Sequence, residues 1–119
     1  MADEKLEKMV KIATTLLERT RAGEIVWEET ADKDTFLCSF PDYSARIARS
    51  RDDGWDESFE LVIVDSKGRR LDSLSSGQGG ADILPEMFEL ARRRALNVDE
   101  ALGNFLETLT ASSSHSSRS

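Results

Sequence analysis

The sequence is poor in the residues that build metal and nucleophilic sites. It holds one cysteine, Cys38, and one histidine, His115. Zinc sites draw on several cysteine, histidine or carboxylate ligands, and a lone cysteine forms no intramolecular disulfide. We therefore expect neither a metal centre nor a disulfide scaffold, and Cys38 is interpreted as a small buried hydrophobe. A reducing cytoplasm is the expected location.

Long apolar runs and an excess of positive charge are also lacking. The first residues, MADEKLEKMV, carry charges where a signal peptide has its apolar core, and no stretch approaches the length of a membrane span. Acidic residues outnumber basic ones by 23 to 16, which gives a net charge of -7. Phosphate backbones repel such a chain. The sequence predicts no membrane span, no nucleic-acid partner, and a preference for a basic protein partner.

The 119 residues suffice for a single domain, and helical and strand periodicities divide it. Apolar residues recur at helical spacing over residues 4–21, and Gly23 follows where a left-handed C-cap ends a helix. Alternating apolar residues then predict five strands. These strands lie at about residues 25–27, 36–40, 43–48, 59–64 and 69–73.

Helical periodicity returns from Leu84 to Ala95. Asn97, followed by Glu100, matches an N-cap with its capping-box partner, so a further helix is expected from Val98 to about Thr110. The apolar residues of this last helix are expected to form a buried face, and they are Ala101, Leu102, Phe105, Leu106 and Leu109. The domain is predicted to span residues 1–110, and the Ser-rich segment 111–119 is predicted to be a disordered tail.

This order of elements predicts an α+β fold. Short connections make neighbouring strands antiparallel, and a sheet with one apolar face needs helices to cover that face. We expect an N-terminal helix, a five-stranded antiparallel meander, and two C-terminal helices packed on one face of the sheet.

Three stretches carry a resemblance to other proteins: LLERTRAGEIVWEET, ELVIVDSKGRRLDSL and LPEMFELARRRALNVDEALGNFLETL. The pattern, over about residues 14–109, resembles one that recurs in a group of small uncharacterised bacterial α+β proteins. The resemblance implies a bacterial cytosolic protein. Its matching positions are core residues, a cap and a turn glycine, so it implies no catalytic residue.

The segment RDDGWDE holds the predicted partner-binding residues. A tryptophan in a polar loop either folds back onto the sheet or remains exposed, and exposed tryptophans are enriched in the centres of interfaces. The predicted site consists of Trp55 with the surrounding acids Asp53, Asp56 and Glu57. A second segment, SSGQGG, precedes a helix as an anion-binding loop does, but it lacks a lysine and is interpreted as a flexible linker.

The arginines have two interpretations. They either pair with nearby acids, which is the expectation here, or converge on one surface as a phosphate-binding face. The residues concerned are Arg46, Arg49, Arg51, Arg69, Arg70 and Arg92, Arg93 and Arg94.

Two functional hypotheses remain. The edge strand, Trp55 and the Leu/Phe-rich helix expected from Val98 offer surfaces for association. The leading hypothesis is therefore a non-enzymatic bacterial protein–protein interaction or adaptor module with an unidentified partner, working as a homodimer or as one subunit of a pair. An immunity or antitoxin subunit is a special case of it. The alternative is a small-ligand-binding or minimal hydrolytic domain that uses the uncovered face of the sheet, with Trp27, Tyr43 and nearby acids lining a pocket. No catalytic, cofactor-binding or metal-binding residue is predicted.

Overall fold

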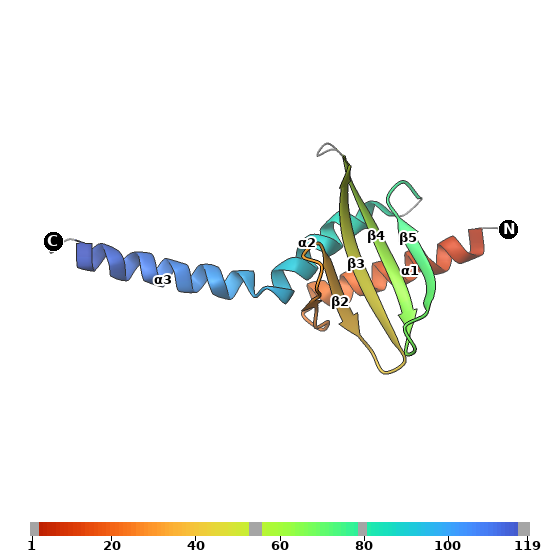
Figure 1. The fold of residues 1–119 in the computed structure, drawn as a ribbon, viewed down its shortest axis with the longest axis horizontal. Helices are drawn as coiled ribbons and strands as arrows, with labels where there is room; N and C mark the ends of the chain where they lie inside the picture. Colours follow the sequence, from red (N-terminus) through yellow and green to blue (C-terminus); the bar gives the residue numbers. More distant parts are fainter. Residues whose placement is uncertain (1–2, 53–55, 79–80, 117–119) are drawn as a thin grey trace.

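The computed structural model describes residues 3–52, 56–78 and 81–116 (Figure 1). Its elements, in chain order, are α1 (Asp3–Arg21), β1 (Glu28–Glu29), β2 (Thr35–Ser39), β3 (Tyr43–Asp52), β4 (Asp56–Asp65), β5 (Arg70–Ser75), a 3-10 turn η1 (Ala81–Ile83), α2 (Leu84–Ala95) and α3 (Val98–Ser116). The α+β fold class predicted from the sequence is confirmed. No helix within these ranges is long and apolar enough to cross a membrane.

Helix α1 forms and ends as its sequence predicts. Its buried side chains recur at helical spacing and include Met9, Ala13 and Leu16. Gly23 has a φ of 78°, a left-handed conformation that costs glycine little. In that conformation the Gly23 N–H donates to the Thr20 carbonyl oxygen, which satisfies one of the last carbonyls of the helix.

The five strands form one antiparallel meander in the order β1-β2-β3-β4-β5. One row of side chains crosses four of them, with Phe36 opposite Ile47, Ile47 opposite Leu61, and Leu61 opposite Leu74. All four are buried. Since directly opposite residues share a face of an antiparallel sheet, this row marks the core face.

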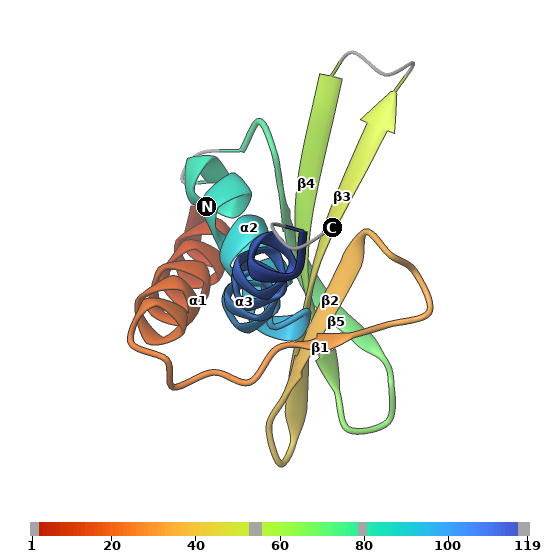
Figure 2. The same ribbon diagram turned by 90° about the vertical axis from the view of Figure 1, so that its left-hand side faces the viewer.

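Helices α1 and α2 lie on the same side of the sheet (Figure 2). Phe88 of α2 is at the centre of this layer, with its ring centroid 5.5 Å from that of Phe36 and 5.6 Å from that of Phe59. The guanidinium carbon of Arg49 lies 4.7 Å from the centroid of the Phe88 ring. The Phe88 ring therefore joins α2 to β2 and β4 by aromatic packing and to β3 by a cation–π contact.

Helix α3 differs from the expectation. It extends away from the layered part of the domain (Figure 1), and the Cα radius of gyration is 18.0 Å, against about 13.5 Å for a compact chain of this length. The apolar residues of α3 are exposed: Leu102 by 55%, Phe105 by 58%, Leu106 by 65% and Leu109 by 48%. The predicted burial of this face is wrong, because periodicity reveals an apolar stripe on a helix but not what covers it.

The joint between α2 and α3 consists of Leu96 and Asn97. Asn97 has a φ of 52°, and its N–H donates to the Arg94 carbonyl oxygen, so it ends α2 as a left-handed residue. The predicted break is confirmed, but its basis is the backbone conformation of Asn97. Helix α3 then runs to Ser116, past the end expected near Thr110 and into the Ser-rich segment.

Candidate functional site

The segment RDDGWDE connects two strands that are longer than predicted. The ladder between β3 and β4 continues through Arg51 opposite Glu57 to Asp52 opposite Asp56, and this hairpin extends beyond the other strands (Figure 2). Of the predicted partner-binding residues, Asp56 begins β4, while Asp53 and Trp55 lie outside the described residues. Their role in partner binding stays a prediction.

Glu57 is the predicted partner-binding residue whose side chain is described. Its carboxylate accepts a hydrogen bond from the Arg51 Nε at 3.0 Å, and the Arg49 guanidinium lies 3.7 Å from it. Both arginines lie on the neighbouring strand. Glu57 therefore participates in an ion-pair cluster of the hairpin, where it is matched by local positive charge.

The interpretation of the arginines as paired surface residues is confirmed for most of the set. Carboxylate partners within 3.0 Å are Asp34 for Arg49, Glu57 for Arg51, Asp65 for Arg69, Glu60 for Arg70, Glu89 for Arg92 and Asp99 for Arg93. The hydrogen bond from Arg49 lowers the pKa of Asp34, and the hydrogen bond from Arg92 lowers the pKa of Glu89. These pairs neutralise the positive charge that a phosphate-binding face requires.

Cys38 is buried on the core face of β2, as expected. Burial raises the pKa of its thiol to about 12, because a low-dielectric surrounding disfavours the thiolate. A thiol that stays protonated at neutral pH is a poor nucleophile. Within residues 3–52, 56–78 and 81–116, no group of three or more His, Cys, Asp or Glu residues is arranged to hold a metal ion.

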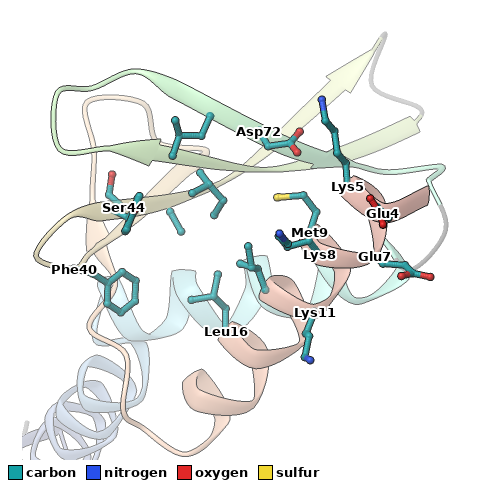
Figure 3. A pocket seen from close by; sticks show the side chains of 15 residues that line it. Glu4, Lys5, Glu7, Lys8, Met9, Lys11, Leu16, Phe40, Ser44 and Asp72 are labelled. Atoms are coloured by element: carbon teal, nitrogen blue, oxygen red, sulfur yellow. The ribbon is translucent and has the colours of Figure 1, made fainter. Parts of the chain in front are cut away.

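A groove of about 900 Å³ opens between α1 and the ends of β3, β4 and β5 (Figure 3). Met9 and Leu16 project into it from α1, and Phe40 lies at one end. Tyr43 and Leu71 line its strand side, and both are about half exposed. The groove therefore exposes apolar side chains beside α1, on the face of the sheet that carries the core.

The charges around the groove are unevenly distributed. At the N-terminal end of α1, lysines alternate with Glu4 and Glu7, and Asp72 of β5 adds an acid on the strand side. Toward Phe40, an adjoining hollow of about 330 Å³ shares Ile12 and Leu16 with the groove. The charged residues that line this hollow are all basic, and they are Lys8, Lys11 and Arg19. This end of the groove is therefore apolar with a positive rim.

The predicted pocket residues are not brought together. Trp27 is 3% exposed, and its Nε1 donates a hydrogen bond to the Oγ1 of Thr20 at 3.0 Å, inside the core. The expectation that Trp27 lines a pocket is wrong. Tyr43 does line a groove, but the groove is on the side of the sheet that α1 covers, and the alternative hypothesis had used the opposite side.

The sequence indicated the surface of α3 in two ways, as a buried face and, because the helix is rich in Leu and Phe, as a surface for association; in the structure its large apolar residues are exposed. The stripe consists of Leu102, Phe105, Leu106 and Leu109, and its spacing is visible in the sequence. A second signal was available, since residues 98–116 contain three acids and no lysine or arginine. The apolar stripe thus belongs to a purely acidic helix.

Comparison of the chain with protein-family models, with curated proteins and with solved structures finds no match.

Proposed function

We propose that this protein is a non-enzymatic protein–protein interaction module, and that α3 is its binding element. The observation that carries the proposal is the exposed stripe of Leu102, Phe105, Leu106 and Leu109. These residues stand at positions i, i+3, i+4 and i+7, the spacing by which an amphipathic helix binds an apolar groove. Contiguous apolar patches on the surface of a soluble domain mark interaction sites.

The negative charge of α3 indicates which kind of partner surface it would bind. Asp99, Glu100 and Glu107 give the helix a negative charge. A matching surface is an apolar groove with a basic rim, since complementary potentials favour association. This agrees with the expected preference for a basic partner. An adaptor in the bacterial cytoplasm, or an immunity or antitoxin subunit that masks a basic protein surface, would use such a helix.

The proposal is tested by capture with three forms of the tagged full-length chain: wild type, Leu106→Glu and Asn104→Glu. Leu106 is on the stripe, and Asn104 lies on the opposite side of the same helix, so the two variants add the same charge at different faces. We expect a protein bound by wild type and by Asn104→Glu to be lost from Leu106→Glu. Circular dichroism checks that all three forms are folded. Equal retention by Leu106→Glu and wild type contradicts the proposal.

The groove beside α1 favours a second candidate function, the binding of a small apolar ligand. Its volume of about 900 Å³ falls within the range of ligand pockets, and its lining is largely apolar, with three lysines and three acids around it and only basic charged residues in the hollow near Phe40. A thermal-shift screen of amphipathic anions tests this function. A ligand that raises the melting temperature of wild type should lose its effect in Tyr43→Glu, because that substitution places a negative charge in the groove.

A further inference from the structure

The chain carries both halves of a helix-in-groove contact. One half is the α3 stripe, and the other is the groove between α1 and the ends of β3, β4 and β5. We propose that α3 of a second copy of this chain occupies the groove, and that two copies exchange their α3 helices to form a homodimer. This proposal rests on the proposed function and identifies the partner as the chain itself.

The lengths of the two surfaces are compatible. The groove follows α1 from Glu4 to Leu16, which corresponds to roughly 18 Å of helix. The stripe runs from Leu102 to Leu109 over roughly 10 Å. The groove is therefore long enough for the whole stripe, and a docked helix would lie beside α1 on the same face of the sheet.

The contact would cover apolar side chains on both partners. Phe40, Tyr43 and Leu71 are among the large apolar residues that the described chain leaves exposed, and all three line the groove. The four stripe residues of α3 are exposed as well. Burial of both sets together removes apolar surface from water, which is the main driving force of association.

Charge favours the groove over a second α3 as the binding partner. Two α3 helices packed against each other would bring together helices that each carry three acids and no lysine or arginine. The groove is lined by three lysines and three acids, but the hollow that adjoins it near Phe40 has only basic charged residues, Lys8, Lys11 and Arg19. Opposite potentials favour the encounter of α3 with this end of the groove, whereas like potentials oppose the pairing of two α3 helices.

The joint between α2 and α3 favours a second copy over the same chain. Only Leu96 and Asn97 separate the helices, and their N–H groups donate to the carbonyl oxygens of Arg92 and Arg94. Arg93 also pairs with Asp99 across the joint. These contacts hold α3 pointing away from the N-terminal end of α1, where the groove begins (Figure 1). Helix α3 can reach the groove of a second copy without breaking the contacts at this joint. When each copy places its α3 in the groove of the other, the two contacts form a closed two-fold dimer.

Light scattering after size exclusion, over a series of concentrations, measures the oligomeric state of full-length variants. We expect a dimer for wild type. The stripe variant Leu106→Glu and the groove variant Tyr43→Glu/Leu71→Glu should each be monomeric at concentrations where wild type is dimeric. Matched controls place glutamate elsewhere: Asn104→Glu on the other side of α3, and Val26→Glu at a residue that is 74% exposed and does not line the groove. Both controls should remain dimers.

Mixing the two monomeric variants gives the decisive result. The stripe variant keeps an intact groove, and the groove variant keeps an intact α3, so one of the two contacts can form. We expect a heterodimer in the mixture and in neither variant alone. Because a single contact lacks the gain from two linked contacts, the mixture is measured at higher concentration than wild type. Circular dichroism confirms that each variant is folded.

Three results overturn the inference. The first is a wild type that remains monomeric at every concentration. The second is a groove variant that still dimerises while Leu106→Glu does not, which indicates pairing between two α3 helices. The third is a mixture that stays monomeric at the highest concentration. The proposed function fails separately, when Leu106→Glu retains captured proteins as wild type does, whatever the oligomeric state of the two forms.

Discussion

The hydrogen bond between Trp27 and Thr20 ties the segment after α1 to the helix itself, and its loss should measurably destabilise the fold. The perturbation is Thr20→Val, which preserves the shape of the side chain and removes the Oγ1 acceptor. Trp27 is 3% exposed and Thr20 is fully buried, so water cannot replace the lost partner. A buried donor without an acceptor costs about 1–3 kcal/mol. For a chain of this size, that corresponds to a fall in melting temperature of roughly 4–12 °C.

Urea denaturation followed by circular dichroism measures this cost, with an unchanged m-value as the sign of an unchanged unfolded state. The control is a double-mutant cycle with Trp27→Phe, which removes the donor. In the Trp27→Phe background, Thr20→Val should cost at least about 1 kcal/mol less than in wild type. Equal costs in the two backgrounds would refute the reasoning, because they would show that the hydroxyl matters for another reason.

Three further predictions concern the core and its charges. The Cys38 thiol is buried and protonated, so iodoacetamide should label it only through unfolding; labelling that does not slow when the fold is stabilised contradicts this. Because Arg49 lowers the pKa of Asp34 in the folded state, the pair stabilises the fold above the unfolded pKa of about 4, and this stabilisation is lost as the pH falls through the folded pKa. The stability difference between wild type and Asp34→Asn should therefore shrink from pH 7 to pH 3, and a constant difference in urea titrations argues against the pair. Phe88→Leu removes two aromatic contacts and the cation–π contact, so it should lower the free energy of unfolding by about 2–4 kcal/mol. Phe105→Leu on exposed α3 should change the free energy of unfolding by less than about 0.5 kcal/mol. Similar urea midpoints for both variants would contradict the description of the core.

The elements that bury one face were predictable from the sequence, because a buried face imposes its period on the chain. The alternation of Phe36 with Cys38 and the helical spacing before Gly23 both correspond to observed elements. The strand predicted from the apolar run Ile25–Trp27 is wrong. Ile25 and Trp27 are buried against the core from a connection, and the paired strand is only Glu28–Glu29. A buried connection that pairs with no strand has the same pattern of apolar residues as a short strand.

The candidate site was less predictable for a physical reason. A groove forms where two elements distant in sequence leave a gap, as α1 does with Tyr43 and Leu71, and no local pattern encodes the width of a gap. The α3 stripe was visible as a pattern, but a pattern of apolar residues on a helix is the same whether its own domain or another chain covers it. The sequence of a helix therefore predicts that its apolar face is buried, but it does not identify which element or which chain buries it.

Because α3 projects from the layered part of the domain, one group of residues presents the exposed surface of α3 and another determines the stability of the fold. Substitutions between Leu102 and Leu109 act on residues that are exposed in the folded domain, so they change the free energy of folding little. Substitutions in the layered part act on folding first. Selection can therefore alter what the helix binds while the scaffold stays constant, and variants of this chain could diversify in partner choice without first acquiring compensating changes in the core.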